Sequence, residues 1–252
     1  MLPDALFLNV HMYGIMIAIG ILFAFGVLFF YGKKASVDAK FLDFVFYDGL
    51  ISIAVGFGFA ALFQAIYNYI KNPSAGFHVG EGITFIGGLI GGVACCLVIY
   101  YFCRKKYNNS LLDVLSLLPC CIVLAHGFGR IGCFFAGCCY ARETDCFLGV
   151  KFPGMPNPVH PTQLYEATFL FLLFALFSYL LLKKKYKYNM PLYLILYGTF
   201  RFLLEFIRGD ERGRLIGIFS PSQFWSVLMI IGGMVFYMVF FRLLKNKEVS
   251  TV

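Results

Sequence analysis

Long apolar runs separated by short polar segments make up nearly the whole chain. A transmembrane helix needs about 20 mainly apolar residues to cross roughly 30 Å of hydrocarbon. Seven runs approach or exceed this length: Met12 to Tyr31, Asp48 to Ile70, Ile83 to Cys103, Leu111 to Ile131, Thr162 to Leu182, Met190 to Ile207 and Phe219 to Leu243. We therefore predict an all-α integral membrane protein with about seven transmembrane helices.

The composition agrees with this pattern and excludes a soluble protein. Of the 252 residues, 60% are hydrophobic and 13% are charged, and the mean hydropathy is +0.80, as is typical of polytopic membrane proteins. No polar stretch is long enough for a soluble domain, so residues 1–252 are predicted to form a single polytopic membrane domain. The first apolar run has no basic segment before it and no small-x-small cleavage site, which indicates a retained helix.

The distribution of basic residues predicts how the helices cross the membrane. With the N-terminus outside, the inner segments carry 13 Lys and Arg and the outer segments carry 6, and basic residues favour the cytoplasmic side. We therefore predict an outside N-terminus, a cytoplasmic C-terminus and an extracytoplasmic Cys-containing loop at 133–160. The net charge of +8 then lies mostly at the cytoplasmic rim, where it attracts anionic membrane lipids. It does not indicate nucleic-acid binding.

Two arginines, Arg130 and Arg201, are predicted at membrane depth, where ionisable side chains are costly and usually functional. Arg201 shares a helix face with Tyr197, Glu205 and Arg208, which recur at spacings of three or four residues. Simpler interpretations are that Arg130 snorkels to the interface and that Arg201 only pairs with Glu205. Because a guanidinium makes two parallel hydrogen bonds to phosphate, we predict that both arginines bind a phospholipid head group and stabilise a departing phosphate.

Other candidate side chains flank these arginines. His126 lies one helical turn before Arg130, and an imidazole titrates in the range that suits a general base; the alternative is a hydrogen-bonded histidine of the core. In H-P-T-Q-L-Y-E-A, Glu166 follows Thr162 and Gln163. This segment predicts either a helix start capped by Thr162 and Gln163, with an acid favoured by the helix dipole, or part of the functional site.

Four of the nine cysteines, Cys133, Cys138, Cys139 and Cys146, follow the fourth apolar run. Zinc sites usually contain C-x2–4-C pairs, which this spacing lacks, so no metal site is predicted. A disulfide is chemically permitted outside the cytoplasm, with Cys138 or Cys139 reaching Cys133 or Cys146. A nucleophilic thiol favoured by the charge of Arg130 and plain packing are the other interpretations.

Six short motifs are spread over nearly the whole chain. They are Y-G at 13–14, G-G-L-I-G at 87–91, G-R-I-G at 129–132, H-P-T-Q-L-Y-E at 160–166, Y-G-x-x-R-x-x-x-E-x-x-R at 197–208 and S-x-x-Q at 220–223. Together they resemble the prolipoprotein diacylglyceryl transferases of bacteria, whose seven spans and extracytoplasmic site agree with the charge distribution.

The resemblance implies transfer of the diacylglyceryl group of phosphatidylglycerol to the lipobox cysteine thiol of a prolipoprotein, with a thioether formed and glycerol phosphate released. It implies a multi-pass protein of the bacterial cell membrane that binds phosphatidylglycerol, prolipoprotein signal peptides and membrane lipids and needs no cofactor. The predicted catalytic residues are Arg130, Arg201, His126 and Glu205. The predicted substrate-binding residues are Arg130, Arg201, Tyr13, Tyr197, His160, Gln163, Glu166 and Arg208.

The chain departs from the family pattern at two places. In the family signature G-R-x-G-N-F-x-N-G-E, the two asparagines and the glutamate are replaced here by Cys133, Ala136 and Cys138. In the third helix, Ile86 replaces the histidine of the usual F-H-G-G-L-I-G. The missing histidine leaves three interpretations: another group such as His126 replaces it, it is not required, or the acceptor differs. A transferase of the same fold with another thiol or membrane acceptor and a non-catalytic phospholipid-binding protein are therefore the alternative functions.

Overall fold

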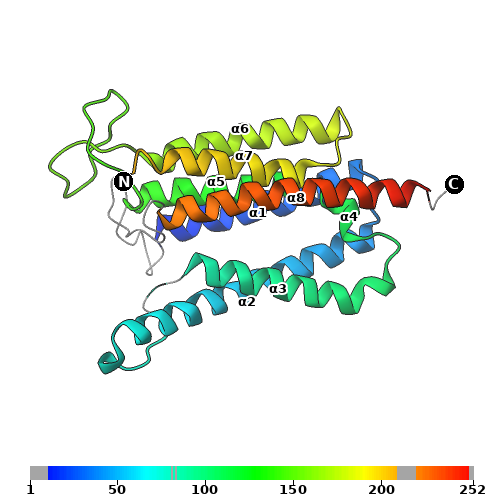
Figure 1. Cartoon of the computed structure of the whole chain (residues 1–252), viewed down its shortest axis with the longest axis horizontal. Coiled ribbons are helices and arrows are strands. Elements are labelled where there is room, and N and C mark those ends of the chain that lie inside the picture. Colours follow the sequence, from blue (N-terminus) through cyan, green and yellow to red (C-terminus); the bar gives the residue numbers. More distant parts are fainter. Residues whose placement is uncertain (1–10, 81, 83, 209–219, 250–252) are drawn as a thin grey trace. The chain divides into compact units, whose positions relative to one another are not determined.

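The structure, a computed structural model, describes residues 11–80, 82, 84–208 and 220–249. Its helices are α1 (Met12–Lys34), α2 (Ala39–Lys71), α3 (Phe85–Cys103), α4 (Leu111–Val114), α5 (Leu118–Phe135), α6 (Thr162–Leu182), α7 (Asn189–Leu204) and α8 (Pro221–Val249), with 3-10 turns at Pro73–Ala75 and Arg104–Lys106 (Figure 1). The chain forms two compact units, residues 1–35 with 114–252 and residues 36–113.

The prediction of an all-helical membrane protein is confirmed. Among the described residues, six helices are long and apolar enough to cross a membrane. The remaining predicted span corresponds to α7, which has 16 residues and continues as a tighter turn in which Arg208 N–H donates to the Glu205 carbonyl. The predicted span edges Ile83 and Phe219 lie outside the described residues. So do Arg212 and Arg214, two of the six basic residues counted above in the outer segments.

The prediction of one continuous helix from Leu111 to Ile131 is wrong. The chain forms the single turn α4, a break at 115–117, and then α5. The cause is Pro119, which occupies the first turn of α5, where its missing N–H is harmless; its ring would clash with the carbonyl four residues earlier in a continuous helix. Asn189 Nδ2 donates to the Ser116 carbonyl of the break at 2.9 Å, so the start of α7 stabilises it.

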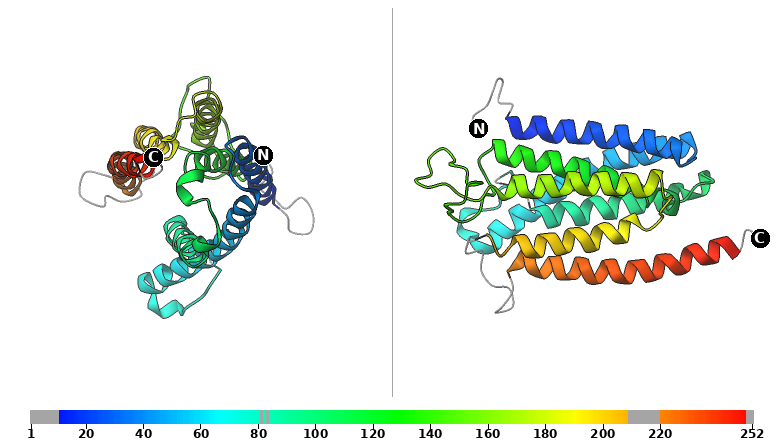
Figure 2. Two further views of the ribbon diagram at one scale, coloured as in Figure 1. Left: turned by 90° about the vertical axis from the view of Figure 1, so that its right-hand side faces the viewer. Right: turned by 90° about the horizontal axis from the view of Figure 1, so that it is seen from above.

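In the first unit, α5 packs against α1 and α6, and α7 packs against α8; Figure 2 shows the α7–α8 pair running alongside each other. Close approach of α1 and α5 depends on glycine. A Cβ at Gly20 would lie 3.0 Å from the Ala125 carbonyl oxygen, and one at Gly132 would lie 3.1 Å from Cδ2 of Tyr13. Small residues at such crossings let helix backbones approach within van der Waals distance, so Tyr13 is held against the last turns of α5.

The second unit is built around the α2–α3 pair. The glycines of α3 permit this pair to pack closely, because a Cβ at Gly91 would lie 2.4 Å from Cγ of Phe59. Across the pair, a Cβ at Gly56 would lie 3.0 Å from the Gly88 carbonyl oxygen. This small-residue interface follows the spacing expected for closely packed membrane helices.

A loop of residues 136–161 joins α5 to α6. Val150 and Val159 exchange two backbone hydrogen bonds of 3.0 Å, and Thr144 N–H donates to the Pro158 carbonyl at 2.9 Å, so the loop folds back on itself. The predicted loop began at Cys133, but α5 continues to Phe135, which places Cys133 on the helix.

Candidate active site

Glu166 on α6 lies at the centre of a buried polar cluster. Its side chain is 2% exposed, and Oε2 lies 3.0 Å from Nε of Arg130 on α5. Its other oxygen, Oε1, accepts a hydrogen bond of 2.6 Å from the Tyr197 hydroxyl on α7. A buried carboxylate needs such partners, since its desolvation is otherwise costly. Three helices are thereby joined through one acid.

His126 and Arg130 lie on the same face of α5, as the four-residue spacing predicted. Arg130 Nε donates toward His126 Nε2 at 3.3 Å, and His126 Nε2 lies 3.6 Å from Glu166 Oε1. The imidazole also meets the Tyr197 ring edge-on at a centroid distance of 5.3 Å. His126 is therefore part of the same cluster, whose members come from α5, α6 and α7.

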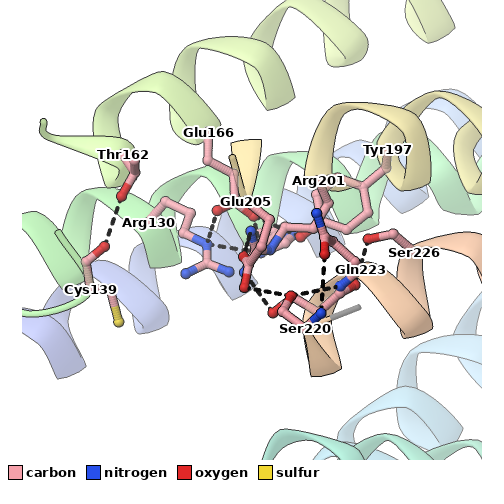
Figure 3. A network of polar contacts seen from close by, with 12 residues as sticks. Arg130, Cys139, Thr162, Glu166, Tyr197, Arg201, Glu205, Ser220, Gln223 and Ser226 are labelled. Carbon is pink, nitrogen blue, oxygen red and sulfur yellow. Dashed lines mark hydrogen bonds and ion pairs between the residues drawn. The ribbon is translucent and has the colours of Figure 1, made fainter. Parts of the chain in front are cut away.

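A second polar cluster joins the end of α7 to the start of α8 (Figure 3). Arg201 Nη1 lies 2.8 Å from Glu205 Oε2, and both side chains are largely buried, so the ion pair that was the simpler interpretation of this spacing is present. Arg201 Nη2 donates to Ser222 Oγ at 3.0 Å, and Ser220 Oγ donates to Glu205 Oε1 at 2.9 Å. This cluster fixes both terminal nitrogens of the guanidinium.

Helix α7 connects the two clusters. Tyr197 and Arg201 are four residues apart and thus neighbours on one helix face. Tyr197 donates a hydrogen bond to Glu166, while Arg201 forms an ion pair with Glu205. Figure 3 shows Arg130, Glu166, Tyr197 and Arg201 directed into one region between the helices. Two positive and two negative side chains thus share this region, each charge having an opposite partner.

The remaining predicted residues lie around these clusters. Tyr13 lies against Gly132 at the end of α5. His160 does not join Glu166: its Nδ1 lies 3.2 Å from the Tyr165 hydroxyl. Arg208 lines an open cavity of about 600 Å³ with residues 137–143, Met155 and Val159. The cavity borders the loop that carries Cys138 and Cys139.

The prediction that Thr162 and Gln163 cap α6 is wrong. The N-cap residue is Pro161, and no side chain caps this helix end. Instead, Thr162 Oγ1 donates to the Cys139 carbonyl at 2.9 Å, and Gln163 Nε2 donates to the Cys138 carbonyl. Both polar side chains are buried, so they hold the loop rather than the helix end.

The model of the prolipoprotein diacylglyceryl transferase family matches residues 3–239. The chain belongs to this family. It is 38% identical to a phosphatidylglycerol–prolipoprotein diacylglyceryl transferase of Clostridium tetani over 90% of this chain and 91% of that protein. A protein of the same name from Campylobacter curvus is 35% identical over 94% of this chain and 91% of that protein. A second form of the enzyme, from Clostridium perfringens, is 32% identical over 91% of this chain and 91% of that protein.

Within this member of the diacylglyceryl transferase family, sequence reasoning missed Ser222, which bonds Arg201. No spacing rule singles out a serine in the first turn of a helix. The S-x-x-Q motif has a local purpose: Gln223 N–H donates to Ser220 Oγ at 3.2 Å, and Ser220 N–H donates to Gln223 Oε1 at 3.0 Å. This reciprocal pair is a capping box, which orients Ser220 toward Glu205.

The cysteines of this family member also interact. The Sγ atoms of Cys133, Cys138 and Cys139 all lie within 4.8 Å of one another, whereas Cys146 is an exposed thiol outside this group. Hydrogen bonding from the Cys133 and Cys138 thiols, with the nearby charge of Arg130, lowers the pKa of the Cys139 thiol. All nine cysteines are free thiols, so the disulfide that was one of the interpretations of this spacing is absent from this structure.

Proposed function

We propose that this protein transfers the diacylglyceryl group of phosphatidylglycerol to the lipobox cysteine thiol of prolipoproteins. The thiol sulfur attacks the glyceryl carbon that carries the phosphate ester. A carbon–sulfur bond forms, the carbon–oxygen bond breaks, the thiol proton leaves, and glycerol phosphate departs with the electron pair. The protein would act in the bacterial plasma membrane as a multi-pass enzyme on phosphatidylglycerol and on prolipoprotein signal peptides.

The observation that carries the proposal is the orientation of Arg130. Within the described residues, its polar contacts to Glu166 and His126 use Nε, and the side chain is 22% exposed. Its two terminal Nη groups are thus the edge that would take two phosphate oxygens in parallel hydrogen bonds. Such a contact strengthens as negative charge develops on the departing phosphate.

Arg201 would act differently. Its Nη1 is paired with Glu205 and its Nη2 with Ser222, so it supplies positive charge near the phosphate and fixes α8 against α7. Glu205 would position that charge. Because Arg130 Nε donates toward the Nε2 lone pair of His126, His126 would accept a proton as general base only if this contact is released on substrate binding.

The other predicted residues would hold the two substrates. Gln163 Oε1 is buried and has no hydrogen-bond partner in the part of the chain that the structure describes. An unpaired buried acceptor costs about 1–3 kcal/mol, which a substrate hydroxyl or N–H would recover. Tyr13 at α5 and His160 and Arg208 near the loop would contact the lipid or the signal peptide, and Tyr197 and Glu166 would orient Arg130.

Complementation of a bacterial strain depleted of its own transferase tests the proposal. We expect growth and, by mass spectrometry, diacylglyceryl on a lipobox cysteine. Arg130→Ala and Arg201→Ala should each abolish the product, whereas Lys151→Ala, at an exposed loop position, should behave like wild type. Membrane levels of every variant are measured by immunoblot.

The alternative functions give different results. If a well-expressed protein modifies a small thiol or another membrane protein but no lipobox cysteine, the acceptor is different. The other alternative predicts tight phospholipid binding without any product. Cys133 and Cys138, which stand where the family signature has other residues, favour a different acceptor over this alternative. Wild-type turnover in Arg130→Ala would refute the assignment of this arginine to the phosphate.

A further inference from the structure

Three cysteine side chains meet where α5 ends, close to but outside the cluster around Glu166. Cys133 lies on the last turns of α5, and Cys138 and Cys139 lie in the loop that follows. Their three Sγ atoms lie within 4.8 Å of one another. Cys138 is exposed and the other two are partly buried, so the group is open to solvent on one side.

The backbone explains why Cys133 and Cys138 meet. Cys138 N–H donates to the Cys133 carbonyl at 3.2 Å, and Gly137 N–H donates to the Phe134 carbonyl at 3.1 Å. With Gly137 at a φ of +67°, these are the two hydrogen bonds of a Schellman motif, which ends a helix through a left-handed glycine. This motif brings together the side chains at its first and last positions, here two thiols instead of the usual apolar pair.

Cys139 is held next to them by α6. It has a φ of +67°, a left-handed conformation that a residue with a Cβ rarely adopts and that often marks a functional position. Thr162 Oγ1 bonds the Cys139 carbonyl at 2.9 Å, and Gln163 bonds the Cys138 carbonyl. Two buried side chains of α6 thus support the loop on which two of the thiols lie, as a preorganised binding site requires.

The spacing of the sulfur atoms fits a metal ion. In a three-coordinate thiolate site with zinc–sulfur bonds of about 2.3 Å, the sulfur atoms lie roughly 4 Å apart. A mutual distance within 4.8 Å is therefore closed by small side-chain rotations. Three sulfur atoms this close can bind one ion together, and thiolate sulfur selects soft or borderline cations over magnesium and calcium.

We propose that Cys133, Cys138 and Cys139 form a binding site for Zn²⁺ or another thiophilic d10 cation, with the fourth coordination position open. Metal binding displaces the protons of the thiols that become ligands and involves no change of oxidation state. Three protein ligands with an open position are typical of zinc sites that bind an exogenous ligand rather than purely structural ones. The site does not depend on the proposed transfer reaction.

The sequence spacing predicted no metal because it lacks C-x2–4-C pairs. In the structure, the end of α5 and the left-handed residue Cys139 bring the three thiols together without such pairs. A disulfide would use only two of the three sulfur atoms and would leave the third thiol unpaired.

Metal titration of the purified full-length protein in detergent, reduced and then freed of reductant, tests the proposal. Cd²⁺ serves as the spectroscopic probe through its sulfur-to-metal charge-transfer absorbance, and Zn²⁺ is measured by competition with a chromophoric chelator. We expect one ion per chain in wild type and in Cys146→Ser, the matched control from the same loop. Cys133→Ser, Cys138→Ser and Cys139→Ser should each weaken binding at least tenfold.

A measurement on the wild type alone guards against variants that fail to fold. Alkylation followed by mass spectrometry should show that Zn²⁺ slows modification of Cys133, Cys138 and Cys139 but leaves Cys146 unchanged. Equal metal binding by the triple serine variant would overturn the proposal. The proposal would also be overturned if the reduced wild type bound no more Cd²⁺ than the triple serine variant. This outcome includes the case in which two of the thiols form a disulfide when the reductant is removed.

Discussion

The hydrogen bond between Tyr197 and Glu166 offers a direct test of the buried cluster. Tyr197→Phe removes only the hydroxyl, which donates to Glu166 Oε1 at 2.6 Å. The carboxylate is 2% exposed, so water cannot readily replace the lost donor. A hydrogen bond to a charged group contributes about 1.5–3 kcal/mol to the free energy of unfolding. At about 2–4 °C per kcal/mol for a chain of this size, the unfolding midpoint should fall by roughly 3–12 °C.

A double-mutant cycle isolates this interaction from other effects of the substitution. Glu166→Gln keeps an oxygen that can accept from Tyr197 but removes the charge, so the same Tyr197→Phe change should cost only about 1 kcal/mol in that background. Thermal unfolding of the purified protein in detergent, followed by circular dichroism, gives all four midpoints.

Tyr193→Phe is the matched control. Tyr193 is buried one turn earlier on α7 and stacks on Tyr197 at a centroid distance of 5.7 Å, whereas the hydroxyl that donates to Glu166 Oε1 is that of Tyr197. Its midpoint should stay near that of wild type. The reasoning fails if Tyr197→Phe leaves the midpoint unchanged, or if it costs as much in the Glu166→Gln background as in wild type.

Three further outcomes are expected. Gly91→Ala should destabilise the α2–α3 pair by about 1–3 kcal/mol, because its Cβ would lie 2.4 Å from Cγ of Phe59. The control Gly58→Ala, whose Cβ would meet nothing within 4 Å, should not lower the unfolding midpoint. Equal losses in the two variants would contradict the packing argument. Thr162→Val removes the hydrogen bond to the Cys139 carbonyl and should speed alkylation of Cys139, measured by mass spectrometry; an unchanged rate would show that α6 does not fix the loop. Arg130→Lys should lower the initial transfer rate about 10–100-fold, the equivalent of about 1.5–3 kcal/mol. Arg201→Lys should lower this rate less, because a lysine can keep the ion pair. The reverse order would refute the division of roles between the arginines.

The helices were predictable from the sequence because membrane-spanning runs obey one dominant constraint, the burial of every backbone polar group in an apolar helix. The error at Leu111 to Ile131 arose because hydropathy continues through Pro119, while the backbone cannot. The orientation of the helices across the membrane and the single polytopic domain stay predictions.

The candidate site was predicted only in part. Spacing along one helix correctly paired His126 with Arg130 and Arg201 with Glu205, because residues four apart are neighbours on a helix. The contact of Glu166 with Arg130 joins α6 to α5, and its hydrogen bond to Tyr197 joins α6 to α7; such contacts depend on how helices are rotated against each other. Propensity near the helix start suggested capping for Thr162 and Gln163, yet tertiary contacts with the loop prevailed.

The end of α5 has a consequence for how this family can change over evolution. A Schellman motif depends on main-chain hydrogen bonds and on one left-handed residue, here Gly137, and its hydrogen bonds involve neither of its first and last side chains. In the family signature these two positions carry asparagine and glutamate, and in this chain they carry Cys133 and Cys138. The frame can therefore stay fixed while the chemistry it presents is exchanged as a pair. New ligand preferences could arise in this way beside Arg130 without any redesign of the surrounding helices.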